Sequence, residues 1–334
     1  MIFAGDGEVQ GTMAFKGLQP ILYGGREVWP LVEGGKGVAA TNHTSSGAWA
    51  AAGGIGTVSA VNADSYDAEG KIIPQVYNAL TRRERHEELI RYAIDGAVEQ
   101  VRRAYDIASG KGAININVLW EMGGAQQVLE GVLEKTRGLV TGVTCGAGMP
   151  YKLSEIAARF NVNYLPIVSS GRAFRALWKR AYHKVADLMG AVVYEDPWLA
   201  GGHNGLSNAE DPLQPQDPYP RVKALRETMR EGGISDEVPI VMAGGVERRA
   251  AETAVIGVHQ VFMARFRAGE RMVAGGPAVV VFVVFKHREI HHPQRTPFAH
   301  KIAAGFAAFV ADLDAQRADG VVDHLGLVGA EEDQ

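Results

Sequence analysis

The chain has 334 residues, of which 46% are hydrophobic and 22% are charged, and its formal net charge is −4. These values are ordinary for a globular enzyme with a sizeable core, and they argue against a general electrostatic attraction to nucleic acid or to an anionic membrane. The chain has one cysteine, Cys145, which excludes an internal disulfide and fits a reducing compartment. The first residues show no signal-peptide pattern. We therefore expect a cytoplasmic protein without a membrane span.

The predicted elements alternate between strands and helices along the chain. Residues 1–30 are glycine-rich and weakly patterned, so we expect an N-terminal arm there. Apolar runs predict strands at residues 37–42, 55–60, 113–119, 138–144, 164–169, 191–194 and 238–243. Helical spacing of apolar residues predicts helices at residues 45–52, 81–109, 126–136, 152–160, 172–189 and 221–231.

This β-α-β-α alternation predicts the fold class. Nearly continuous apolar strands are typical of a parallel sheet that is covered on both faces. At least five repeats without a G-x-G-x-x-G opening favour a (β/α)8 TIM barrel over an open doubly wound sheet. We expect the barrel to span residues 31–285, with a loop insertion at 199–220 and a buried strand in the apolar run 277–285. Residues 286–334 are predicted to form a helical tail.

The active site of such a barrel lies where the strands end, so residues that follow the strands are the candidates. Asn117 lies near the end of an apolar strand, where the polar edge of a bound ligand would give its amide a partner. Asn115 on the same strand is the alternative, and a partner elsewhere in the core would explain either residue. Gly146 follows the next strand and would leave room for a planar ring, although a plain turn before the next helix explains it equally well.

Three further candidates, Cys145, Ser169 and Ser170, are explained by structural roles. Cys145 has no histidine partner visible in the sequence, so we interpret it as a buried structural thiol and not as a nucleophile. Ser169 and Ser170 end a strand and precede a helix. We prefer a helix-capping role for them, with a substrate contact as the alternative.

The segment Ala200–Gly205 is the motif in the sequence that most strongly indicates a functional site. Gly201 and Gly202 would let the backbone come close to a ligand while His203 points at it, and a histidine can take or hold a proton near neutral pH. A surface loop with a histidine is the alternative reading. Gly244 and Gly245 follow another apolar strand, and their exposed N–H groups are typical of a phosphate site.

Together these residues resemble the nitronate monooxygenase (2-nitropropane dioxygenase) family of FMN enzymes. The matching segments are 52–57, the strand with Asn117, 200–205 and 238–246. The resemblance implies an FMN-dependent oxidoreductase with a TIM barrel, in which His203 is the catalytic base and Asn117, Gly201 and Gly202 contact the flavin. It also implies that Gly244 and Gly245 bind the FMN phosphate.

The implied reaction is the oxidation of an alkyl nitronate by O2 to a carbonyl compound and nitrite. The implied partners are a nitronate or nitroalkane and O2, and we expect no nucleic acid, membrane or metal partner; homodimerisation is left open. The alternatives are an NAD(P)H-dependent reductase of enoyl thioesters or quinones on the same scaffold, and a family member that has lost its activity.

Two departures from the family pattern matter. Gly34-Gly35-Lys36-Gly37 replaces the usual Gly-Met after the first strand, which leaves the substrate open. After residue 246 the usual Gly-Thr-Arg segment is missing, and all 5 Trp and all 10 Tyr lie before residue 220. One hypothesis is that the segment from about Glu247 onward comes from a shifted reading frame or a fusion; a divergent but genuine tail is the other.

Overall fold

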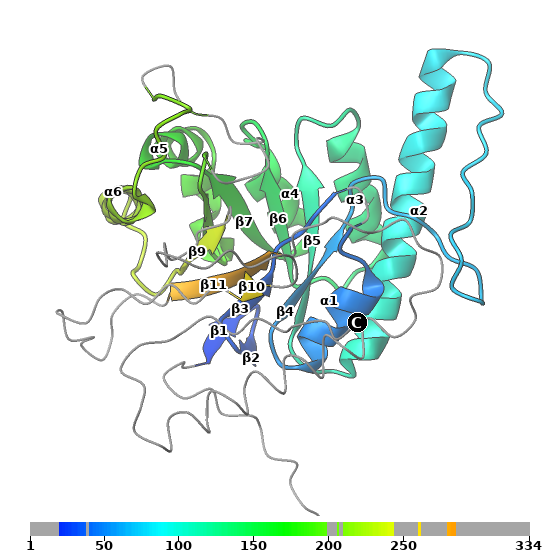
Figure 1. Cartoon of the computed structure of the whole chain (residues 1–334), viewed down its shortest axis with the longest axis horizontal. Coiled ribbons are helices and arrows are strands. Elements are labelled where there is room, and N and C mark those ends of the chain that lie inside the picture. Colours follow the sequence, from blue (N-terminus) through cyan, green and yellow to red (C-terminus); the bar gives the residue numbers. More distant parts are fainter. Residues whose placement is uncertain are drawn as a thin grey trace, which may run out of the picture.

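Figure 1 shows the computed structural model of the chain. It describes residues 20–37, 40–198, 206, 210–243 and the two strands 260–261 and 279–284. Five predicted site residues lie outside the described residues, namely Gly201, Gly202, His203, Gly244 and Gly245. The predicted tail at 286–334 also lies outside them.

Eight parallel strands form a closed ring, which confirms the predicted (β/α)8 barrel. Seven of them follow one another in chain order: β3 (Leu31–Glu33), β4 (Ile55–Ser59), β5 (Ala113–Leu119), β6 (Gly142–Gly146), β7 (Asn163–Val168), β8 (Val192–Glu195) and β9 (Ile240–Ala243). The eighth, β11 (Val279–Val284), pairs in parallel with both β9 and β3 and so closes the ring. A short strand, β10 (Gln260–Val261), lies antiparallel to β11.

Helices cover the outer face of this sheet (Figure 1). They are α1 (His43–Ala51), α2 (Arg82–Ala108), α3 (Ala125–Lys135), α4 (Leu153–Phe160), α5 (Gly171–Arg180) and α6 (Pro218–Glu231). The longest, α2, begins at a capping box in which Thr81 and Glu84 satisfy each other's backbone N–H groups. The outward-facing strand residues and the inner faces of these helices form the larger hydrophobic core.

A hairpin fills the bottom of the barrel, where an N-terminal arm was expected. Its strands are β1 (Ile21–Tyr23) and β2 (Arg26–Val28). The ring of Tyr23 is 3% exposed and lies against Gly142, the first residue of β6. A Cβ added to Gly142 would lie 1.9 Å from the Tyr23 hydroxyl oxygen, so the close approach depends on glycine. The hairpin therefore closes the end of the barrel where the strands begin.

Three predicted elements were wrong in place or in length. The described residues of the predicted strand at 37–42, which are 37 and 40–42, do not lie in a strand; the carbonyl of Lys36 accepts hydrogen bonds from the N–H groups of Ala40 and Thr41 and so forms a turn. The first barrel strand is β3, six residues earlier. The predicted helix at 172–189 ends at Arg180 and continues as a 3-10 segment, Tyr182–Leu188. The strand expected at 138–144 begins only at Gly142, after a turn.

No helix in the described part of the chain is long and apolar enough to cross a membrane.

Candidate functional site at the carboxyl ends of the strands

Asn117 lies on the inner side of the barrel near the end of β5. Its neighbours in the parallel ladders are Ser59 on β4 and Thr144 on β6. The loop after β3 passes directly over it: a Cβ added to Gly35 would lie only 2.2 Å from the Cβ of Asn117. Only glycine allows this approach, so Gly35 forms part of the wall around Asn117.

Three buried polar side chains lie on the same inner side of β4, β5 and β6. Thr57, Asn115 and Thr144 are exposed by 1%, 0% and 3%. The Thr57 and Thr144 hydroxyls and the Asn115 side-chain nitrogen have no hydrogen-bond partner among the described residues. The Asn115 oxygen is occupied, because it accepts a hydrogen bond from the Tyr23 hydroxyl at 2.9 Å. An unpaired buried polar atom costs about 1–3 kcal/mol, so three of them in one place indicate a missing polar partner.

A second group of buried residues inside the barrel is apolar. Its members are Tyr23 and Val28 of the hairpin and, on the strands, Val32, Ile55, Ala113, Leu165, Ala191, Val193, Val241 and Ala243. The interior therefore has a polar side, where β4 to β6 carry Thr57, Asn115 and Thr144 beside Ile55 and Ala113, and an apolar side formed by the members of this group on β7 to β9. Polar groups facing an apolar lining suit a flat ligand with a heteroatom-rich edge.

Gly146 ends β6 and is buried. A Cβ added to it would lie 2.7 Å from the Cβ of Ile167 on β7, so the neighbouring side chain already requires glycine here. Its carbonyl accepts a hydrogen bond from the Trp120 N–H at 2.8 Å. Packing thus accounts for this glycine, and contact with a planar ring stays a prediction.

Cys145 precedes it and is fully buried. Burial raises the pKa of the thiol well above its usual range, so the reactive thiolate is disfavoured. The interpretation of Cys145 as a structural thiol agrees with both observations.

The two serines after β7 have separate structural roles. The hydroxyl of Ser170 caps α5 by accepting a hydrogen bond from the Ala173 N–H at 3.3 Å, which confirms the capping role for this residue. The carbonyl of Ser169 accepts a hydrogen bond from the Arg221 guanidinium at 2.9 Å. Contact of either serine with a substrate stays a prediction.

The strands that lead to the two glycine motifs are neighbours. β8 and β9 run in parallel with Glu195 opposite Ala243, and the N–H of Asp196 donates a hydrogen bond to the Ala243 carbonyl at 3.0 Å. Gly244 follows Ala243 directly, and His203 comes eight residues after Glu195. Both motif segments therefore leave the same rim of the barrel from adjacent strands.

The base of the loop that carries His203 is held by Arg221 on α6. The Arg221 guanidinium lies 5.0 Å from the Trp198 ring centroid and forms an ion pair with Glu210. Asp196 accepts a hydrogen bond from the Trp198 N–H at 3.0 Å. These contacts fix both the entry to the loop and its exit.

Glu33 and Lys36, at the end of β3, were not among the sequence candidates. The Glu33 side chain is buried and accepts a hydrogen bond from the Thr57 N–H at 2.8 Å. Burial raises its pKa to about 7, and the nearby Ser45 hydroxyl, the Thr57 N–H and the Lys36 ammonium oppose that rise only in part. Burial likewise lowers the pKa of Lys36 to about 8, against the pull of the Glu33 charge. The sequence does contain a signal for these two residues, because an acidic residue ends an apolar run there and is followed by Gly-Gly-Lys.

His43 begins α1 at the same rim. Its ring packs edge-on against Tyr66 at a centroid distance of 5.1 Å, and its Nδ1 atom is buried and has no hydrogen-bond partner in the part of the chain that the structure describes. Burial first, and then the charge of Arg103, lower its pKa to about 4, so this histidine is neutral at physiological pH. No group of acidic, cysteine or histidine side chains within the described segments could hold a metal ion.

No protein-family model matches the chain, and no curated protein matches it. Among solved structures, FabK from Thermotoga maritima matches with a TM-score of 0.43 and 18% identity, over 68% of this chain and 52% of that chain. A nitroalkane oxidase from Streptomyces ansochromogenes matches with a TM-score of 0.43 and 16% identity, over 66% and 59% of the two chains. The enoyl reductase domain of MlnA from Bacillus amyloliquefaciens reaches 0.40 and 11%, over 65% and 48%.

The chain thus spans about half the length of these solved structures. The structural similarity is distant, and similarity at this level assigns no activity to this chain.

Proposed function

We propose that this protein is an FMN-dependent oxidoreductase that oxidises alkyl nitronates with O2, with His203 as the proton-handling base. The observation that carries the proposal is the parallel pairing of β8 with β9, in which Val192 pairs with Ile240 and Glu195 with Ala243. The chain continues from β8 to the histidine segment and from β9 to Gly244-Gly245, so both segments start at the same rim of the barrel. A catalytic base and a phosphate-binding segment that follow adjacent strands can act on one bound nucleotide cofactor.

The lining of the barrel fits a flavin ring. Asn117 and Thr144 offer hydrogen-bonding groups on the polar side, where the Thr144 hydroxyl lacks a described partner. Val193 and Val241 belong to the apolar side. Gly35 keeps the wall beside Asn117 free of a side chain. In this proposal Asn117 and Thr144 hold the heteroatom edge of the ring, and the N–H groups of Gly244 and Gly245 hold the phosphate.

FMN, when bound, supplies the electron acceptor for the substrate. The residues of the chain prepare and position the substrate. His203 takes a proton from the α-carbon of a neutral nitroalkane and so generates the nitronate in place. Asn117 orients the ligand edge, and the apolar side chains of β7 to β9 exclude water from the reacting face. The Arg221–Trp198 contact holds the loop that carries the base.

The test is the absorption spectrum of the purified protein under anaerobic conditions. We expect a flavin band that bleaches when an alkyl nitronate is added and recovers with O2. Bleaching by NADPH but not by nitronate would replace the proposal with a reductase of enoyl thioesters or quinones. A colourless protein that cannot be reconstituted with FMN would overturn both.

The role of the histidine is tested separately with His203→Ala. This variant should keep its flavin spectrum and its turnover of preformed nitronate, while turnover of the neutral nitroalkane falls by about 100-fold or more. His183→Ala is the matched control, because His183 is exposed and its Nδ1 atom lies 2.8 Å from the Trp178 carbonyl oxygen. Equal losses in the two variants would remove His203 from the mechanism.

A further inference from the structure

Lys36 is the only lysine or arginine in residues 27–70, which contain β3, α1 and β4. Its backbone is held in a turn, because its N–H donates a hydrogen bond to the Thr41 hydroxyl at 3.1 Å and its carbonyl accepts hydrogen bonds from the N–H groups of Ala40 and Thr41. Its side chain is half-buried. Lys36 therefore brings a positive charge to the rim where ligands of such barrels bind.

The charge of Lys36 lies at the corner between β3 and β4. Lys36 directly follows Gly35, and a Cβ added to Gly35 would lie 2.2 Å from the Cβ of Asn117 and 3.0 Å from the Cγ2 of Thr57. The Lys36 ammonium also attracts the carboxyl group of Glu33. That carboxyl group accepts a hydrogen bond from the Thr57 N–H at 2.8 Å. Both relations place the positive charge beside the polar side of the barrel interior.

The Glu33 carboxyl does not cancel this charge. Burial raises the pKa of Glu33 to about 7 and lowers the pKa of Lys36 to about 8, while the attraction between the two groups opposes both shifts. In a purely structural ion pair the attraction exceeds the cost of burial, and the carboxyl pKa falls below its usual value. Here burial is the larger effect. At about pH 6 the carboxyl is therefore mostly neutral and the amine is charged, so the corner has a net positive charge.

The polar groups beside this corner are neutral. The hydroxyls of Thr57 and Thr144 and the side-chain nitrogen of Asn115 are hydrogen-bond donors that have no partner among the described residues. A positive charge next to neutral donors in a partly buried site stabilises a ligand whose negative charge lies on hydrogen-bond acceptors. A nitronate is such a ligand, because two oxygen atoms on a planar group share its negative charge. A carboxylate has the same shape and charge.

We propose that Lys36 is a specificity-determining residue that makes the site bind ligands with a planar, two-oxygen anionic group in preference to neutral analogues. The substrate class that follows is the anionic nitronate, and this assignment rests on the proposed function. The preference for an anion does not, because it requires only a ligand bound beside Asn117.

The test uses butyrate and its neutral analogue butyramide as probes, with dissociation constants measured by calorimetry on the purified full chain at about pH 6. We expect the wild type to bind butyrate more tightly than butyramide. Lys36→Met should weaken the binding of butyrate by about tenfold or more and leave that of butyramide nearly unchanged. Lys36→Arg keeps the charge and should retain most of the preference. In turnover of a preformed nitronate, Lys36→Met should raise KM and change kcat little.

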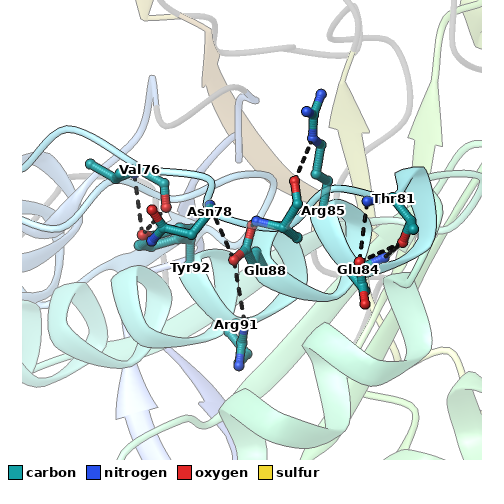
Figure 2. A network of polar contacts seen from close by, with 9 residues as sticks. Val76, Asn78, Thr81, Glu84, Arg85, Glu88, Arg91 and Tyr92 are labelled. Atoms are coloured by element: carbon teal, nitrogen blue, oxygen red, sulfur yellow. Dashed lines mark hydrogen bonds and ion pairs between the residues drawn. The ribbon is translucent and has the colours of Figure 1, made fainter.

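Two further variants separate this role from a structural one. Glu33→Gln should retain the preference for butyrate at about pH 6, whereas a purely structural Glu33–Lys36 pair would be disrupted equally by either substitution. Arg91→Met is the matched control for the loss of one positive charge. Figure 2 shows Arg91 on α2 beside Glu88, with which it forms an ion pair at 4.0 Å, and its side chain is 71% exposed. Its replacement should leave the binding of both probes unchanged.

The outcomes distinguish this proposal from the proposed function. A wild type that prefers butyrate but is not reduced by a nitronate would refute nitronate oxidation and support the role of Lys36. A wild type that binds butyrate no more tightly than butyramide, or not at all, would overturn the role of Lys36, even if a nitronate reduces the flavin. An equal loss of butyrate binding in Lys36→Met and Arg91→Met, or no loss in a folded Lys36→Met, would overturn it as well. Circular dichroism shows whether each variant is folded.

Discussion

Replacing Glu33 with glutamine is expected to make the protein more stable at alkaline pH. Glu33 is 0% exposed, and its carboxylate accepts a hydrogen bond from the Thr57 N–H at 2.8 Å. A glutamine keeps the shape of the side chain and an oxygen for that hydrogen bond, and it removes only the charge. The variant therefore isolates the cost of ionising a carboxyl group between β3, β4 and α1.

The magnitude follows from the pKa of Glu33, which rises from an ordinary value of 4.5 to about 7 in the folded protein. Between these values the folded state binds more protons than the unfolded state, so the free energy of unfolding falls as the pH rises. At about 1.4 kcal/mol per pH unit, the wild type loses about 3 kcal/mol between pH 4.5 and pH 7. The pKa of about 7 already includes the attraction between the Lys36 ammonium and the ionised carboxylate, so about 3 kcal/mol is the net effect that we expect.

The assay is urea unfolding followed by circular dichroism at pH 4.5, 6 and 8. The free energy of unfolding of Glu33→Gln, minus that of the wild type, should increase steadily with pH. Glu155→Gln, an exposed change on α4, corrects for the general effect of losing one carboxylate. A difference between Glu33→Gln and the wild type that stays constant with pH, or that decreases, would refute the reasoning.

Three further outcomes are expected from the packing. Gly56→Ala places a Cβ 1.9 Å from the carbonyl oxygen of Ser46 on α1. The free energy of unfolding, measured by urea denaturation, should therefore fall by about 1–3 kcal/mol. An unchanged value would mean that α1 can shift away from β4 without cost. Cys145 should react with a thiol reagent only as fast as the protein unfolds, and rapid labelling of the native protein would contradict its burial. Tyr23→Phe leaves the Asn115 oxygen without its donor and should cost about 1–3 kcal/mol, measured as a lower Tm; an unchanged Tm would show that another donor replaces it.

Strongly local signals allowed much of the fold to be predicted from the sequence. The strand Ala113–Leu119 was predicted with its observed bounds, because it is an apolar run that begins and ends abruptly. The long helix α2 was predicted within a residue at each end, since its apolar face repeats over many turns. β3 was missed because it has three residues and owes its place to pairing with β4 and β11.

In the candidate site, too, the sequence predicts the local features and misses those that depend on contacts between distant segments. The capping role of Ser170 is local, and the sequence suffices to predict it. The polar side formed by Thr57, Asn115 and Thr144 depends on the register between three strands that are far apart in the chain, so no single segment carries that signal. The burial of Glu33 likewise depends on how closely α1 packs on the sheet. The roles of His203 and of the Gly244-Gly245 pair stay predictions.

The position of β11 in the sequence constrains how the molecule is made. A ribosome delivers β3 to β9 first, and these seven strands form an open, curled sheet with free N–H and carbonyl groups at both edges. β11 emerges 36 residues after the end of β9, and only then can both edges be paired at once. Until then the free edges of β3 and β9 are the places where the growing chain can pair with another chain, and the arrival of β11 removes both at once.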